Sequence, residues 1–283
     1  MSVKRSYLFK DGKKLTLGER TLVMGILNVT PDSFSDGGKW NTIDKALRHM
    51  EAMIKDGADI IDIGAESSRP GFVTMPAAEE IERLLPFLDA VIKECPVPVS
   101  VDTFKAETAE AAVEHGVHIL NDIWGMQYAP EPGKMAEVAA KSDLPIIVMH
   151  NQDGTEYKND IIADMKEFFA KSIAIGAKAG VKRENIILDP GIGFGKTVAG
   201  NLEVLRRQEE LLNIAGKEYP LLLGTSRKSF IAKTMNLPVE ERMEATGASC
   251  VIGIMKGASI VRVHDVKPIA RMCQMTDIIL GSE

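Results

Sequence analysis

The chain alternates between short apolar runs and longer stretches with helical periodicity. Pro145-Ile146-Ile147-Val148-Met149 is the clearest apolar run, and near-continuous apolar sequence is typical of parallel strands that are buried on both faces. Strands are predicted near 22–28, 58–64, 97–102, 118–122, 145–150, 185–189, 221–224 and 259–264. Amphipathic helices are predicted near 42–56, 76–94, 105–115, 132–141, 161–180, 200–215, 240–257 and 266–279.

Eight successive strand–helix units predict the α/β class and a closed (β/α)8 TIM barrel. The segment before the first unit differs, because Tyr7-Leu8-Phe9, Asp11-Gly12 and Leu15-Thr16-Leu17 together indicate a short β-hairpin that could plug the bottom of the barrel. No linker rich in Pro, Gly or Ser divides the chain. We therefore expect a single domain over residues 1–283, with the hairpin in 1–18 and the barrel in 20–280.

Composition narrows the class of protein. The 283 residues fit one barrel of about 250 residues, and the net charge of −6 argues against a nucleic-acid surface. We see no secretory signal and no apolar run that could span a membrane, so a cytoplasmic protein without membrane contact is expected. Cys95, Cys250 and Cys273 lack metal-ligand spacing, which indicates free thiols in a reducing compartment.

Several predicted strands end in polar side chains. Asp102, Asn121 and Asp189 end three different strands, and strand ends in a parallel barrel lie on one rim, where active sites of this fold are built. Carboxylates and an amide that converge there can bind an aminopyrimidine-like edge. The alternative is that each residue only caps the helix that follows. Asp62 lies within the second strand, where a structural acid and a site residue are equally good interpretations.

Basic residues follow the last two strands. Lys228 follows the seventh, and Arg262 and His264 are two apart on the eighth, so they point the same way. Loops after strands seven and eight are a common phosphate site in this fold. A solvated charge cluster is the alternative. It suits Arg227 better than Arg262, whose neighbours are two valines.

Two further motifs favour structural interpretations. The run Gly191-Ile192-Gly193-Phe194-Gly195-Lys196-Thr197 lacks the glycines that a P-loop or a Rossmann fingerprint requires. We interpret it as a flexible turn that exposes Phe194. His150 ends the fifth strand, and we interpret it as a structural histidine rather than a ligand. No serine elbow, HExxH or CxxC motif is present, so the sequence supports neither a serine nucleophile nor zinc catalysis.

Over essentially its whole length the chain resembles the dihydropteroate synthases. The matching segments are Gly25–Gly38, Asp62–Gly71, Ser100–Thr103, Asn121-Asp122, Leu188–Phe194, Ser226–Ser229 and Arg262–Asp265. The first of these is highly specific for the family. There are two departures: Ser68 stands where the family commonly has Thr, and Ala65 where a Gly is common.

The resemblance implies a TIM-barrel transferase of folate synthesis that joins 6-hydroxymethyl-7,8-dihydropterin diphosphate to 4-aminobenzoate, giving 7,8-dihydropteroate and diphosphate. It also implies Mg²⁺, a homodimer, and competition by sulfonamides for the 4-aminobenzoate site. Pterin binding would fall to Asp102, Asn121, Asp189 and Lys228; the diphosphate to Asn28, Arg262 and His264, with Asn28 reaching Mg²⁺; and 4-aminobenzoate to Ser68, Pro70, Phe194, Ser229 and the stem of Lys228. Asp36 and Arg69, on the two long loops 29–41 and 65–75, would act in catalysis with Lys228.

Three other functions remain as alternatives. A pterin-binding methyltransferase barrel with a corrinoid partner would share the acids but has no use for the basic set as a diphosphate site. A catalytically silent pterin-binding protein predicts a missing basic or loop residue, and none is missing. An aldolase-type barrel would need a Schiff-base lysine inside a strand, and no predicted strand has one.

Overall fold

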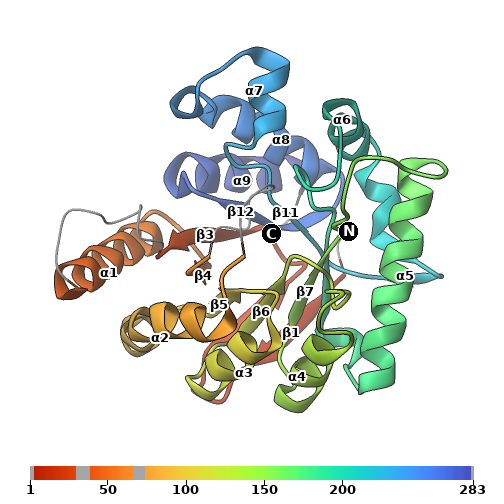
Figure 1. Cartoon of the computed structure of the whole chain (residues 1–283). Helices are drawn as coiled ribbons and strands as arrows, with labels where there is room; N and C mark the ends of the chain where they lie inside the picture. The colour runs from red at the N-terminus through yellow and green to blue at the C-terminus, as the bar shows by residue number, and fades with distance from the viewer. Residues whose placement is uncertain (1–2, 30–38, 67–73, 282–283) are drawn as a thin grey trace.

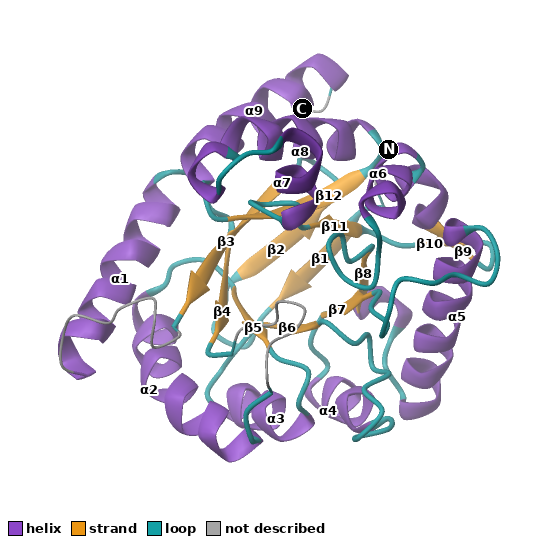
Figure 2. Cartoon of the chain, turned by 45° about the horizontal axis from the view of Figure 1, so that its top comes forward, coloured by secondary structure: helices purple, strands orange, loops and turns teal. Residues whose placement is uncertain are grey.

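A closed barrel of eight parallel strands forms the centre of the protein (Figure 2). The computed structural model describes residues 3–29, 39–66 and 74–281. Around the barrel the strands follow the order β11-β12-β3-β4-β5-β6-β7-β8, and all neighbours are parallel. Their bounds are Leu22–Asn28 (β3), Ile60–Gly64 (β4), Val99–Asp102 (β5), Ile119–Asp122 (β6), Ile146–Met149 (β7), Ile186–Asp189 (β8), Leu221–Leu223 (β11) and Ala258–Val263 (β12). The predicted TIM barrel is confirmed.

Helices follow the strands and form the outer layer of the barrel (Figure 1). They are α1 (Lys39–Lys55), α2 (Ala77–Glu94), α3 (Ala106–Glu114), α4 (Lys134–Ser142), α5 (Ile161–Ala179), α6 (Val198–Arg206), α7 (Ser229–Met235), α8 (Met243–Met255) and α9 (Val266–Leu280). Their apolar faces pack on the outer faces of the strands in one continuous core. Since this burial is what stabilises an amphipathic helix, the helical periodicity located most of these elements.

Two predicted helices differ from the structure. The helix expected over 200–215 ends at Arg206, and a 3-10 turn and a small hairpin follow, formed by β9 (Asn213–Ile214) and β10 (Lys217–Glu218). Ala215 and Gly216 have positive φ angles of 50° and 77°, which a right-handed helix does not accommodate. The helix expected over 240–257 starts at Met243, because α7 and a second 3-10 turn occupy the segment before it.

The N-terminal hairpin closes the bottom of the barrel, as expected. Its strands are β1 (Arg5–Leu8) and β2 (Lys14–Leu17), which pair in antiparallel fashion. The hairpin and the barrel interior share one buried apolar cluster, whose members are Phe9, Leu15, Leu17, Leu22, Met24, Ile60, Ile119, Ile147, Ile187, Leu222 and Ile260. Each buried side chain of this size contributes about 1.5–3 kcal/mol. The hairpin therefore closes the end of the barrel that is opposite the C-terminal ends of the strands.

Inside the barrel, apolar side chains give way to polar side chains at a similar level on several strands. Side chains two positions apart on a strand share a face. Each of four interior isoleucines is followed two residues later by a polar or charged residue; the pairs are Ile60 and Asp62, Ile119 and Asn121, Ile187 and Asp189, and Ile260 and Arg262. Strand alternation thus places this polar layer at the C-terminal rim, where barrel enzymes bind substrates.

Two smaller expectations also concern the fold. Cys95, Cys250 and Cys273 are buried free thiols, as the sequence indicated. Among the described residues, we find no helix with the length and apolarity needed to cross a bilayer.

Candidate active site

Arg262 connects the acids at the barrel mouth. Its Nε donates a hydrogen bond to Asp62 Oδ2 and its Nη2 to Asp102 Oδ2, both at 2.6 Å. Asn121 Nδ2 donates to the same Asp62 oxygen at 3.1 Å. Asp62 is fully buried, and its Oδ1 has no hydrogen-bond partner within the described part of the chain. Asp62 is thus both a hydrogen-bonded acid and a member of the polar cluster at the mouth.

The mouth shifts the proton affinity of its charged groups. Burial raises the pKa of Asp102 to about 7; Arg262 opposes this rise and Asp62 adds to it. Burial also raises the pKa of Asp189, although Lys228 works against it. For Lys228, burial lowers the pKa to about 8 despite the attraction of Asp189. Burial disfavours the Arg262 cation, yet Asp62 and Asp102 together raise its pKa. Such clusters of shifted groups are typical of functional sites.

The glycine-rich turn after β8 forms one wall of the mouth. Asp189 Oδ1 accepts a hydrogen bond from Gly191 N at 2.7 Å. Lys228 Nζ donates to Ile192 O at 2.5 Å and lies 4.7 Å from the centroid of the Phe194 ring. Phe194 is only 9% exposed and packs with Phe104, Ile123 and Met149, which lie in or directly after other strands. The interpretation of this run as a turn that exposes Phe194 was therefore wrong.

His264 and Arg227 lie after the last two strands and have different partners. His264 N donates to Ser226 Oγ at 3.1 Å, and Ser226 Oγ lies 2.9 Å from His264 Nδ1. The Ser226 hydroxyl can donate to a bare Nδ1 or accept from an N–H there, so this pair holds the imidazole ring in place with either ring nitrogen protonated. Arg227 instead binds both oxygens of Asp265.

The structure brings most of the predicted site residues to one rim. Asp102 and Asp189 end β5 and β8, and Asn121 is the last residue but one of β6. Arg262 extends from β12 to Asp62 and Asp102. Asn28 ends β3, is partly buried, and its side chain makes no hydrogen bond within the described ranges. Ser229 is exposed at the start of α7. Asp36, Ser68, Arg69 and Pro70 lie outside the described residues.

A second side-chain cluster was not predicted from the sequence. Lys196 is 8% exposed, and its Nζ lies 3.0 Å from each of three acceptors, which are His150 Nδ1, Gly191 O and Phe194 O. Burial lowers the pKa of Lys196 to about 7. The only sequence signal was the position of Lys196 directly after the glycine-rich run.

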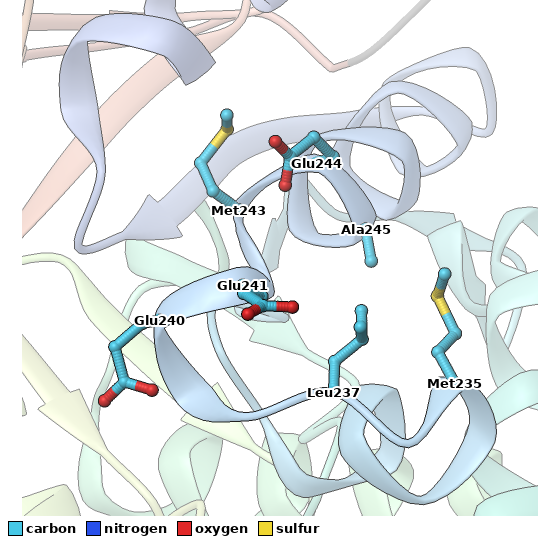
Figure 3. Close-up of a pocket in the computed structure, with 7 residues that line it drawn as sticks. All are labelled: Met235, Leu237, Glu240, Glu241, Met243, Glu244 and Ala245. Atoms are coloured by element: carbon cyan, nitrogen blue, oxygen red, sulfur yellow. The ribbon is translucent and has the colours of Figure 1, made fainter.

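A separate hollow lies away from the barrel mouth. It has a volume of about 540 Å³ and is lined by residues of α7, α8 and the segment between them, namely Met235, Leu237, Glu240, Glu241, Met243, Glu244 and Ala245 (Figure 3). Its lining holds no cation and no strand residue. Arg262 and Lys228 converge with Asp62, Asp102 and Asp189 at the barrel mouth, so the mouth is the candidate active site.

Comparison with known proteins places this site in a family. Residues 24–264 match the family model described as pterin binding enzyme. The dihydropteroate synthase of Clostridium beijerinckii is 54% identical over 272 residues, which cover 95% of this chain and 97% of that protein.

Two solved structures give the same result. A dihydropteroate synthase of Clostridium difficile, crystallised in the presence of pteroic acid, has a TM-score of 0.88 and 48% identity, covering 93% of this chain and 98% of the other. The Xanthomonas albilineans enzyme with 4-aminobenzoic acid has a TM-score of 0.90 and 33% identity over 99% of each chain. The chain therefore belongs to the dihydropteroate synthase family of pterin-binding transferases.

Proposed function

We propose that the protein condenses 6-hydroxymethyl-7,8-dihydropterin diphosphate with 4-aminobenzoate, giving 7,8-dihydropteroate and diphosphate. The observation that carries the proposal is a set of three unused acceptors at the mouth. Asp102 uses Oδ2 for Arg262, Asp189 uses Oδ1 for Gly191, and Asn121 uses Nδ2 for Asp62. The remaining oxygen of each side chain accepts no hydrogen bond from the described residues.

These acceptors suit the pterin ring. An aminopyrimidinone edge presents N–H and NH₂ donors, and all three side chains are at least 90% buried. The free oxygens of these side chains are not among the described buried atoms that lack a partner, so solvent can reach them, and a ligand that supplies donors would replace that solvent. Lys228 Nζ, already placed between Ile192 O and the Phe194 ring, lies beside the same space and provides a donor for the ring.

The proposed reaction breaks a C–O bond and forms a C–N bond. The electron pair of the C–O bond leaves with diphosphate, and the positive charge left at the pterin methylene is delocalised into the ring. Asp102 and Asp189 favour that cation. The amine of 4-aminobenzoate then attacks and loses a proton. No step needs a covalent enzyme intermediate, so positioning and electrostatics supply the acceleration.

A Mg²⁺ ion at the proposed site would be held by Asn28 together with the substrate. Within the described ranges no group of three His, Cys, Asp or Glu side chains could hold a metal. Asn28 offers one amide oxygen at the end of β3, and Mg²⁺ characteristically uses one or two protein oxygens together with phosphates and waters. When bound, the ion would neutralise charge on the departing diphosphate. His264 and Arg262 would contact the diphosphate beside it.

The remaining roles rest on the resemblance. Asp36 and Arg69 would act at the reacting centre, and Ser68 and Pro70 would frame 4-aminobenzoate together with Phe194, Ser229 and the stem of Lys228. Sulfonamides resemble 4-aminobenzoate in shape and charge, so they should compete with it.

We also place the protein in the cytoplasm, because its three cysteines are buried free thiols.

We further propose that the protein is a homodimer. Support comes from the neighbouring helices α8 and α9, whose exposed apolar side chains are Ile252, Met255, Met275, Ile278, Ile279 and Leu280. Contiguous exposed apolar side chains are typical of interfaces. Light scattering should show a dimer that Ile279→Glu dissociates. Leu8→Glu alters an equally exposed leucine in β1 and should leave the dimer intact. A monomeric wild type would refute this assignment.

The activity test is direct. The protein is incubated with the pterin diphosphate, 4-aminobenzoate and Mg²⁺, and dihydropteroate and diphosphate are both quantified. Equimolar formation of the two products is expected. A protein that binds the pterin but releases no diphosphate would instead support the methyltransferase-type or silent pterin-binding alternatives.

A further inference from the structure

The turn 191–195 is held from two sides by buried or partly buried lysines. Lys228 Nζ takes Ile192 O and faces the Phe194 ring. Lys196 Nζ takes the two flanking carbonyls, Gly191 O and Phe194 O, each at 3.0 Å. Three carbonyl groups of the turn, those of Gly191, Ile192 and Phe194, are thereby bound by two lysine amines, one directly after the turn and one directly before α7.

The glycines of this turn permit close packing. Gly191 and Gly195 have φ angles of 62° and 54°. A Cβ on Gly191 would lie 2.0 Å from His150 O, and a Cβ on Gly195 would lie 2.6 Å from Gln152 Cγ. These glycines therefore allow a dense backbone contact, which is the opposite of what a mobile linker needs.

His150 completes the binding of the Lys196 amine. Its Nδ1 lies 3.0 Å from Lys196 Nζ, and burial together with the nearby Lys196 lowers the pKa of His150 well below its ordinary value. The ring is therefore neutral and can accept a hydrogen bond at Nδ1. Its orientation is fixed by the edge contact with Phe168 at 4.8 Å and the stacked ring of Tyr157 at 6.1 Å. Tyr157 in turn donates to Gly195 O at 3.0 Å.

An ammonium group on Lys196 has three donors, and the structure offers three acceptors at equal distance. Burial lowers the pKa of Lys196 to about 7, with Asp189 opposing and Lys228 adding to this effect. Loss of one proton does not release the turn, because a neutral amine keeps two N–H donors for the two carbonyls.

We propose that Lys196, oriented by His150, is a positioning residue that fixes the turn 191–195 so that Phe194 and Lys228 form a preset wall against the arylamine substrate. This inference rests on the proposed function. Lys196 has no N–H donor left for a substrate, because its three donors bind two carbonyl groups of the turn and His150. It acts through Phe194, whose carbonyl it binds, and through Lys228, whose partner Ile192 O belongs to the same turn.

The test compares Lys196→Met with His150→Phe and with a control. Lys171→Met changes an exposed lysine on α5 and serves as the matched control. Steady-state kinetics should show that Lys196→Met raises the KM for 4-aminobenzoate at least tenfold while kcat falls less than threefold. His150→Phe removes one acceptor but keeps both carbonyl bonds, so its KM should rise about threefold. Lys171→Met should leave both constants unchanged.

A second readout needs no catalysis. Hydrogen exchange of the substrate-free protein should show the amides of 191–195 exchanging at least tenfold faster in Lys196→Met, with the strand amides unchanged. If the wild type forms no dihydropteroate, the proposed function fails and the exchange result still decides whether Lys196 fixes the turn.

Three results would overturn the inference. Unchanged exchange in 191–195 would show that Lys196 does not fix the turn. Faster exchange throughout the barrel would show a general structural role. A fall in kcat with no change in the KM for 4-aminobenzoate would show that the turn does not position the arylamine. Should Lys196→Met fail to fold, His150→Phe decides by the same measurements.

Discussion

Arg262→Met should destabilise the substrate-free protein, and the loss should depend on pH. The Arg262 side chain is 18% exposed, and its partners Asp62 and Asp102 are 0% and 8% exposed. Methionine approximates the length of the arginine stem but leaves two adjacent buried carboxyl groups without their shared cation. Breaking a buried ion pair by removing one partner costs about 3–5 kcal/mol. We expect a loss of this size in the free energy of unfolding at pH 8.5.

The direction of the pH effect follows from Asp102. Its pKa rises from an ordinary 3.8 to about 7 in the folded protein. Between these values the folded state binds more protons than the unfolded state, so stability falls as pH rises through this window. Arg262 limits that fall, since it lowers the pKa of Asp102. Without Arg262 the pKa of Asp102 rises further, so stability continues to fall above pH 7. One proton changes the free energy of unfolding by about 1.4 kcal/mol per pH unit.

The measurement is urea unfolding of wild type and variant at pH 5.5 and pH 8.5. From pH 7 to pH 8.5 the variant keeps losing stability while the wild type does not. At pH 5.5 Asp102 is largely protonated in both proteins, so Arg262→Met should destabilise by about 2 kcal/mol more at pH 8.5 than at pH 5.5. Arg20→Met is the control. Arg20 also makes two bonds to one carboxylate, Asp59, but is 54% exposed, so its loss should cost about 0–1 kcal/mol. Equal destabilisation by Arg262→Met at the two pH values, or less than about 1 kcal/mol at pH 8.5, would refute the reasoning.

Other substitutions test separate parts of the structure. Asn121→Ala should weaken binding of the pterin diphosphate in calorimetry by about 1–3 kcal/mol, because a buried donor edge loses its acceptor; unchanged affinity would remove Asn121 from the pterin site. Lys105→Met should cost about 3–5 kcal/mol in urea unfolding, since Lys105 Nζ binds Glu66 at 2.5 Å and Glu80 at 2.9 Å, and both acids are buried; a loss below 1 kcal/mol would show that the acids find other partners. Gly191→Ala should lower the melting temperature clearly, because its Cβ would lie 2.0 Å from a backbone oxygen at a positive φ, and a wild-type melt would contradict the observed backbone.

The barrel could be predicted because its periodicities are local. Each strand is an apolar run, each helix has a repeating apolar face, and the number of units determines closure. The polar layer at the mouth was also accessible, since residues two apart on a strand share a face. Asp102, Asn121 and Asp189 were therefore identified as candidates before their surroundings were known.

Partners across the barrel could not be predicted in the same way. Asp62 and Arg262 are 200 residues apart in sequence, and their hydrogen bond exists only because β12 closes the barrel against β3. The sequence therefore could not show whether Asp62 is a structural acid or a site residue. The glycine-rich run was misread for a related reason. Its glycines suggested mobility, whereas the structure uses them to pack the backbone against His150 and Gln152, two residues from a different βα unit.

The charges at the barrel mouth indicate where the pterin and the diphosphate would lie in the proposed reaction. Three carboxyl groups, those of Asp62, Asp102 and Asp189, face two basic groups, Lys228 and Arg262. One negative charge is in excess when all five are ionised, and this state is favoured only above the pKa of about 7 that burial gives Asp102. Such an environment favours a pterin cation but opposes an anionic leaving group. In the proposed reaction the acids would hold the pterin, and the diphosphate would lie further out, towards Asn28 and His264 at the ends of β3 and β12.

Arg262 is suited to join these two regions. Its Nε and Nη2 are committed to the acids, while Nη1 makes no hydrogen bond within the described part of the chain. A guanidinium can therefore hold the carboxylates on one side and present two N–H donors on the other. This division would let Arg262 serve both the acids and the diphosphate of the proposed reaction, which lysine, with its single ammonium head, could not do. In the proposed reaction, a Mg²⁺ ion at Asn28 would offset the negative charge of the diphosphate that Arg262 and His264 leave unbalanced.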